Sequence, residues 1–117
     1  MRNISFMLTT NQVRNKTKTV PRRLGWKFLK AGDLLCACVK CQGLKKGEKL
    51  ERLAIIRVTD VRLEPLYDIT ADDVRLEGFE GKSPEWFIGM FMREMGVPSS
   101  QEVTRIAFEY IEDKPND

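Results

Sequence analysis

Side chains that could bind or transform a ligand are concentrated between residues 15 and 27, where the chain reads NKTKTVPRRLGWK. Cations alternate with hydroxyls here, and a Trp follows a pair of Arg residues. Cations attract phosphate, hydroxyls orient it as neutral donors, and a Trp ring can stack on a base, so the pattern favours contact with nucleic acid. A solvated basic loop is the alternative interpretation. The candidate nucleic-acid-binding residues are Lys16, Thr17, Lys18, Arg22, Arg23, Trp26 and Lys27.

The charge of the chain is distributed unevenly. Residues 1–32 contain eight of the 20 Lys and Arg residues and none of the 17 acids. The first 32 residues therefore carry a net charge of +8 and the remainder −5, against +3 for the whole chain. Such an asymmetry predicts a basic face that meets a polyanion, although it does not say which polyanion.

Length and composition indicate an ordinary globular protein. A chain of 117 residues predicts a single domain, which we place at residues 1–112, followed by a flexible tail at 113–117. No apolar run approaches the ~20 residues that a membrane span requires, so no membrane contact is expected. The first residues lack the pattern of a signal peptide, which predicts a cytoplasmic protein.

The cysteines do not form a recognisable metal motif. Cys36, Cys38 and Cys41 supply three thiols, and the sequence contains no His, whereas a zinc site usually has four nitrogen or sulfur ligands. We expect reduced, mainly structural thiols, no metal and no cofactor. The absence of His also removes the commonest general acid and base, so catalysis would rest on Lys, Thr, Ser, Glu, Asp, Tyr or Cys.

Local patterns predict the elements that position these residues. Two helices are expected before the last strand: one begins at the Thr70 cap and stops at Gly78, and the other begins at Ser83-Pro84 and stops at Gly96. The pattern predicts an α+β fold, a small and mostly antiparallel β-barrel with two inserted helices. The expected strands lie at residues 4–8, 17–20, 34–40, 50–61 and 103–111, with a brief helix at 11–15.

Three motifs, in this order and spacing, are similar to those of a known family. They are KTVPRR at residues 18–23, KAGDLL at 30–35 and ITADDVRLEG at 69–78. Over residues 4–111 the chain resembles the ASCH domain, a small β-barrel related to the PUA fold, and it also resembles compact members from bacteriophages. The resemblance implies a cleft beside the helical insertion that binds RNA or a modified nucleoside. It also implies an enzyme as an alternative, because some bacterial ASCH proteins remove the acetyl group of N4-acetylcytidine and others cleave RNA.

The resemblance assigns catalytic roles residue by residue. The amidohydrolases use a Lys, a Thr three residues later and a Glu from the helical insertion, which fall on Lys18, Pro21 and Glu77. Pro21 has no hydroxyl to attack an acyl carbon, so the reaction would need water or a substitute. Thr19 is one candidate, because it would share a face with Pro21 in a regular strand.

The physical role of a Lys18–Glu77 pair has two interpretations. Lys18 would act as a base only if burial outweighed the effect of the carboxylate on its pKa; otherwise the pair is an ordinary ion pair at the mouth of the cleft. Arg22 and Arg23 fit phosphate contact better than catalysis, and Trp26 could either stack on a base or cap the barrel. The sequence thus predicts a binding module for RNA or a modified nucleoside, with an N4-acetylcytidine amidohydrolase as the alternative. It leaves the oligomeric state open.

Overall fold

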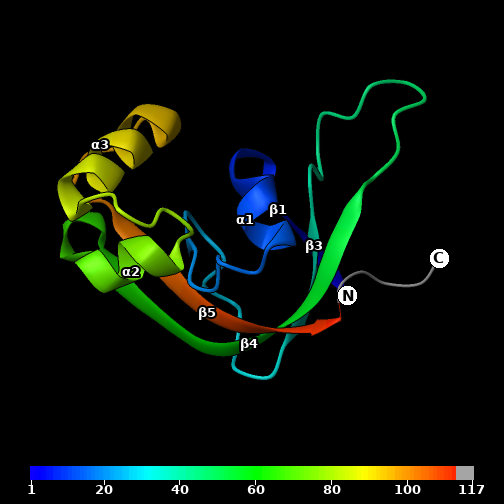
Figure 1. Ribbon diagram of the computed structural model, residues 1–117, viewed down its shortest axis with the longest axis horizontal. Coiled ribbons are helices and arrows are strands. Elements are labelled where there is room, and N and C mark those ends of the chain that lie inside the picture. Colours follow the sequence, from blue (N-terminus) through cyan, green and yellow to red (C-terminus); the bar gives the residue numbers. More distant parts are fainter. Residues whose placement is uncertain (113–117) are drawn as a thin grey trace.

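A curved five-stranded sheet forms the frame of the computed structural model, which describes residues 1–112 (Figure 1). The order across the sheet is β1-β3-β4-β5-β2, with β1 parallel to β3 and the other neighbouring pairs antiparallel. This half-barrel with helices before its last strand confirms the predicted α+β fold. The tail predicted at residues 113–117 lies outside the described residues. The strands are β1 (Arg2–Ser5), β2 (Arg22–Arg23), β3 (Leu34–Cys38), β4 (Arg52–Pro65) and β5 (Glu102–Glu112).

The two long strands β4 and β5 run side by side as a bent ribbon along the molecule (Figure 1). In the first half of β4, the alternate residues Ala54, Ile56 and Val58 are buried, which is the period-two pattern of a strand with one face on the core. The pairing with β5 shifts register between Val58 and Asp60, and such irregularities let a strand bend. β4 is the central strand of the sheet, with two strands on either side.

The predicted helix signals are borne out at α2 (Ala71–Leu76) and α3 (Pro84–Met95). The Thr70 hydroxyl oxygen accepts a hydrogen bond from the backbone N–H of Asp73, and the Ser83 hydroxyl caps α3 in the same way. Gly96 ends α3 in the left-handed conformation, with φ of 65°. Shorter elements are η1 (Met7–Thr9), α1 (Thr10–Arg14), on the concave side of the sheet, and η2 (Leu66–Asp68).

The strand predicted at residues 17–20 is wrong. This segment has no regular strand structure, because the backbone N–H groups of Thr19 and Val20 both donate to the carbonyl of Leu76 at the end of α2. Its other side still follows β5, where the N–H of Phe108 donates to the carbonyl of Thr19. The α2 terminus thus competes for donors that a partner strand would otherwise use, and β2 is confined to Arg22–Arg23.

The buried apolar residues form two clusters. The sheet cluster, built around Ile4, Phe6, Ile56 and Phe108, fills the concave side of the sheet. The helix cluster lies at the α2–α3 end and consists of Leu66, Ile69, Val74, Phe87, Phe91 and Val103. Among residues 1–112, no helix is long and apolar enough to cross a membrane.

Candidate functional site

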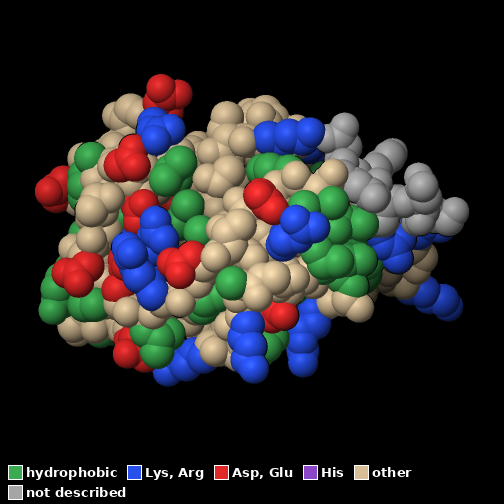
Figure 2. Space-filling model, turned by 90° about the horizontal axis from the view of Figure 1, so that it is seen from below, with side chains coloured by type: hydrophobic (Ala, Val, Ile, Leu, Met, Phe, Trp, Pro, Cys, Tyr) green, Lys and Arg blue, Asp and Glu red, His purple; other side chains and the backbone are tan. Residues whose placement is uncertain are grey.

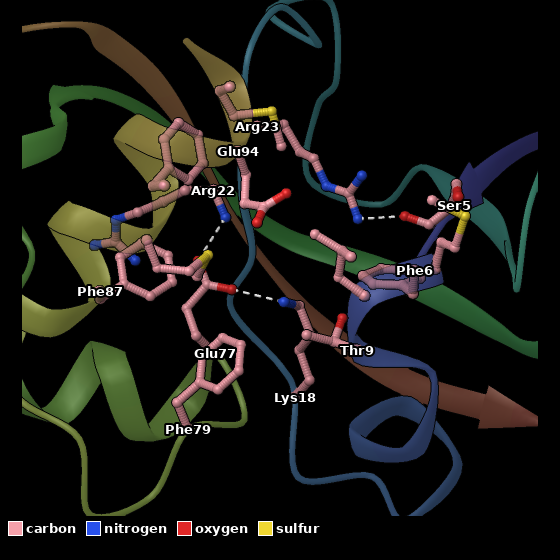
Figure 3. Close-up of a pocket in the computed structure, with 15 residues that line it drawn as sticks. Ser5, Phe6, Thr9, Lys18, Arg22, Arg23, Glu77, Phe79, Phe87 and Glu94 are labelled. Carbon is pink, nitrogen blue, oxygen red and sulfur yellow. Dashed lines mark hydrogen bonds and ion pairs between the residues drawn. The ribbon is translucent and has the colours of Figure 1, made fainter. Parts of the chain in front are cut away.

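A pocket of about 220 Å³, here called the aromatic pocket, opens between the two clusters (Figure 3). Phe6 comes from the sheet cluster, and Phe87 and Phe91 come from the helix cluster. The pocket therefore occupies the seam between two packed regions. Its other lining residues are Ser5, Met7, Leu8, Thr9, Lys18, Arg22, Arg23, Glu77, Phe79, Met90, Glu94 and Met95.

Lys18 and Glu77 form a buried ion pair in the wall of this pocket. Lys18 Nζ lies 2.8 Å from Glu77 Oε1, and the two side chains are 7% and 2% exposed. The second carboxylate oxygen, Oε2, accepts a 2.9 Å hydrogen bond from the backbone N–H of Arg22. The ammonium also faces the rings of Phe6 and Phe79, at 5.9 and 5.7 Å from their centres. The structure thus brings together the two residues that the sequence paired (Figure 3).

Backbone contacts from three elements fix this geometry. The backbone N–H of Lys18 donates to the carbonyl of Gln12 in α1, and its carbonyl accepts a 2.6 Å bond from the Tyr110 hydroxyl of β5. Glu77 caps the C-terminus of α2, and Gly78 follows with φ of +95°. A Cβ on Gly78 would lie 2.6 Å from Gln12 Cγ, so only Gly lets α1 approach Glu77 this closely.

Burial determines the protonation behaviour of Lys18. Removal of the ammonium from water lowers the pKa of Lys18, and the attraction of Glu77, which raises it, offsets this only in part. The positive charge of Arg23 lowers the pKa further. Burial therefore outweighs the carboxylate, which is the condition for a Lys to lose its proton more readily and to serve as a base.

Arg22, predicted to contact phosphate, is instead held inside the molecule. Its Nη2 lies 2.6 Å from Asp73 Oδ2 and 2.8 Å from Glu64 Oε2, and its side chain is fully buried. Arg105 binds the same Asp73 carboxylate, and hydrogen bonds from Arg105 and Arg22 together hold the pKa of Asp73 at about 2. Arg22 Nε and Nη1 are buried with no hydrogen-bond partner in the described structure. Its guanidinium therefore stabilises the junction of sheet and helices rather than facing solvent.

Arg23 does face the aromatic pocket. Its guanidinium lies over the Phe6 ring, 4.8 Å from the ring centre, and Nη2 donates a 2.5 Å hydrogen bond to the carbonyl of Ser5 (Figure 3). Burial lowers the pKa of Arg23 below its ordinary value. Lys18, Arg22 and Arg23 are thus the cations of the basic stretch that line the pocket, and of these the Arg22 guanidinium is held by Asp73 and Glu64.

The other predicted residues lie elsewhere. Thr19 lines a second hollow together with Lys16 and Thr17, on the other side of the segment that carries Lys18. Thr19 was a candidate to supply the hydroxyl that Pro21 lacks, because the two residues would share one face of a regular strand. That strand is not formed here. Trp26 packs against the sheet cluster with its ring 5.6 Å from that of Phe28. Lys27 pairs with Glu102, 3.0 Å away. Pro21 is buried but does not line the aromatic pocket.

Acids from the rest of the chain neutralise much of the basic N-terminal segment. Ion pairs with acids between residues 33 and 112 hold several of its cations: Arg14 with Glu51, Lys18 with Glu77, Arg22 with Asp73 and Glu64, and Lys27 with Glu102. On the face shown in Figure 2, Asp and Glu lie among Lys and Arg on the left half, whereas Lys and Arg predominate along the lower edge and on the right. The charge asymmetry therefore serves folding as well as any ligand.

Sequence reasoning missed most of the pocket wall. Phe87, Met90 and Phe91 belong to the apolar run at residues 86–95, which is typical of a helix that covers a core, and no sequence pattern singles out Phe79. Phe87 and Phe91 are members of the helix cluster, and Phe79 and Met90 pack against it. All four residues also line the pocket. Thr9, which is 5% exposed and lines the pocket, is not marked as a site residue by any pattern in the sequence. The adjacency of residues 5–9 to Lys18 has no signal in the sequence.

Two of the three thiols are buried, and the third, Cys41, is half-buried. Cys36 and Cys38 are buried with Sγ atoms 3.9 Å apart, and burial raises the pKa of Cys38 to about 12. Within residues 1–112, no group of three or more His, Cys, Asp or Glu residues is arranged to hold a metal ion.

Comparison with known proteins identifies the class of fold. No family model matches the sequence, and no match was found among curated proteins. Among solved structures, the chain is similar to an ASCH domain from Lactobacillus crispatus JV V101, with a TM-score of 0.66, 16% identity, and coverage of 95% of this chain and 79% of that one. The chain therefore has an ASCH-like fold.

Two further solved structures agree with this class. Protein EF3133 from Enterococcus faecalis V583, described by the family model DUF984, gives a TM-score of 0.61 and 18% identity over 94% of this chain and 74% of that one. Hypothetical protein PH0355 gives a TM-score of 0.63 and 15% identity over 94% of this chain and 96% of that one. At these identities the comparisons establish the fold, and function must be argued from the pocket.

Proposed function

We propose that this protein binds a single nucleobase, presented by RNA or as a modified nucleoside, in the aromatic pocket. The observation that carries the proposal is the buried Lys18–Glu77 pair, 2.8 Å apart, in a pocket otherwise walled mainly by aromatic and other apolar side chains. An ammonium and a carboxylate offer a donor and an acceptor to the edge of a base, while the half-buried Phe79 ring offers a face for stacking. The ASCH-like fold and the motif resemblance support the same class of ligand.

Size and charge favour a base over a phosphate in this pocket. The volume of about 220 Å³ is below the roughly 300–1,000 Å³ typical of sites for drug-sized ligands, and it suits one small planar group. Lys18 and Arg23 are balanced by Glu77 and Glu94, and Arg22 is already paired with acids outside the pocket. We therefore expect nucleoside binding to depend only weakly on salt, because few counterions are released.

Calorimetric titration with cytidine and N4-acetylcytidine tests this proposal. Loss of one stacking face in Phe79→Leu should weaken binding by about 1–3 kcal/mol, the usual value of base–aromatic stacking. Tyr67→Leu is the matched control, because Tyr67 is 56% exposed on η2 and does not line the pocket. The proposal fails if neither nucleoside binds, or if both variants weaken binding equally.

A specific observation also supports amidohydrolase activity as a second candidate function. The pKa of Lys18 is lowered beside Glu77, so a neutral amine is more accessible as a general base in this pocket. Hydrolysis of N4-acetylcytidine would add water across the amide and release cytidine and acetate. Either water or the Thr9 hydroxyl would attack the acyl carbon, because Pro21 offers no hydroxyl.

Product analysis after incubation with N4-acetylcytidine tests this second candidate. Activity in the natural chain that disappears in Lys18→Ala and Glu77→Ala would support it, and a further loss in Thr9→Val, but not in Thr19→Val, would identify Thr9 as the attacking group. Activity only in Pro21→Thr would mean that the site is silenced at that residue. Turnover that survives both Lys18→Ala and Glu77→Ala would contradict the assigned roles.

A further inference from the structure

A second concavity, here called the polar hollow, lies beside the aromatic pocket and has the opposite character. It has a volume of about 700 Å³ and is formed by the end of α1, the end of α2 and the loop that leads to α3. Its walls are rich in cations, hydroxyls and amides, whereas the aromatic pocket is mainly apolar. The lining residues that matter here are Lys16, Thr17, Thr19, Arg75, Phe79 and Lys82.

The segment that carries Lys18 separates the two concavities. Lys18 lines the aromatic pocket, while its neighbours Thr17 and Thr19 line the polar hollow. Phe79 lines both, so the ring that would stack on a base in one also forms a wall of the other. A nucleotide whose base enters the aromatic pocket past Phe79 would therefore carry its ribose and phosphate towards the polar hollow.

The chemistry of the polar hollow suits phosphate. Among the described residues that line the polar hollow, Lys16, Arg75 and Lys82 are cations and Glu80 is the acid. Arg75 also binds Asp72, and Lys82 lies 5.1 Å from the centre of the Trp86 ring. Cations together with hydroxyl and amide donors are the groups that contact the phosphates and sugars of nucleic acids.

We propose that the polar hollow holds the phosphodiester backbone next to a nucleotide whose base occupies the aromatic pocket, so that the ligand of this protein is a single strand of RNA. The proposal rests on the proposed function of the aromatic pocket. A single strand presents an unstacked base to the aromatic pocket without the cost of flipping that base out of a duplex. It also gives the +8 segment a nucleic-acid role at Lys16 and Thr17 rather than at Arg22.

The test compares three probes by calorimetry over a range of salt concentrations: cytidine, cytidine 5′-monophosphate and the trinucleotide UpCpU. The variant combines Lys16→Asn, which suits the positive φ of 63° at this residue, with Lys82→Gln. The control combines Lys45→Asn with Lys46→Gln, which removes the same charge from an exposed loop between β3 and β4 that lines neither concavity.

The trinucleotide should bind roughly tenfold more tightly than cytidine at low salt, since charged hydrogen bonds to phosphate are added. The Lys16/Lys82 variant should remove that gain and reduce the slope of log affinity against log salt by about 1.4, or roughly 0.7 for each lost phosphate contact. Its affinity for cytidine should be unchanged, and the loop control should behave like the natural chain.

Equal affinity for the trinucleotide and cytidine, or an equal loss in the loop control, would overturn the proposal. A gain with the monophosphate that the trinucleotide does not share would also overturn it, because the ligand would then be a free nucleotide. Trinucleotide binding that depends on Lys16 and Lys82 but not on Phe79 would refute the base in the aromatic pocket. That result would overturn the proposed function and leave phosphate contact in the hollow supported.

Discussion

Replacing one or both members of the Lys18–Glu77 pair would show whether the pair is retained for folding or for the pocket. Two unit charges 2.8 Å apart attract by roughly 6 kcal/mol at an effective dielectric constant of about 20. Removing each ion from water costs several kcal/mol, so the two contributions nearly cancel. The lowered pKa of Lys18 indicates that the cost of burying its ammonium exceeds the attraction of Glu77.

We therefore expect Lys18→Met or Glu77→Gln alone to lower the free energy of unfolding by about 3–5 kcal/mol, because each leaves a buried charge without its partner. The double variant should recover most of this loss, because no buried charge remains unpaired and the Gln oxygen can still accept the N–H of Arg22, although it should lose ligand binding. Urea denaturation followed by Trp fluorescence measures this.

The exposed pair Arg57–Glu109, at 3.0 Å with side chains 48% and 52% exposed, is the control for this cycle. Replacing both of its members with Gln should change stability by less than about 1 kcal/mol. A double Lys18/Glu77 variant as unstable as the single variants would refute the reasoning, since the pair would then be a net contributor to folding.

Two further predictions concern the residues around the pair. Gly78→Ala should destabilise the protein by about 2–4 kcal/mol, because φ is +95° and the new Cβ would lie 2.6 Å from Gln12 Cγ. Thermal unfolding of both variants measures this. Gly32→Ala, with φ of +97° and open space around the new Cβ, should lose only the stability that the positive φ costs. An equal loss of stability in the two variants would contradict the close-contact argument. Hydrogen bonds from Arg105 and Arg22 lower the pKa of Asp73 from 3.8 to about 2. The contribution of the Asp73 carboxylate to the free energy of unfolding is therefore present above about pH 4 and is lost as the pH falls towards 2. Asp73→Asn should therefore reduce the difference in free energy of unfolding between pH 7 and pH 2 by about 2 kcal/mol, measured by urea denaturation at both values, and an unchanged difference would refute this assignment.

The elements that could be predicted from the sequence are those fixed by local signals. Thr70 and Ser83 each cap their own helix, and Gly96 ends α3 through its own backbone conformation. The segment 17–20 could not be predicted in this way, because its donors are captured by the carbonyl of Leu76 from another part of the chain. Local propensity there was overridden by a tertiary contact.

The same distinction applies to the pocket. Lys18 and Glu77 were found through the motif resemblance, and the structure brings them together. Arg22 was expected to meet phosphate, but its acid partners Glu64 and Asp73 lie 42 and 51 residues away in sequence, and no local pattern reveals them. The aromatic walls were missed because a Phe that lines a pocket and a Phe that fills a core have the same helical spacing.

The position of the aromatic pocket between the sheet cluster and the helix cluster has a consequence for the unfolding of the molecule. An incompletely filled seam weakens the cooperativity between the two packed regions, so the α2–α3 end should open as a unit at a lower free energy than the β4–β5 ribbon. A bound base would fill the seam and join the two regions into one unfolding unit. Backbone amides of α3 should then exchange with solvent faster than those of β4 in the free protein, and ligand should slow them selectively.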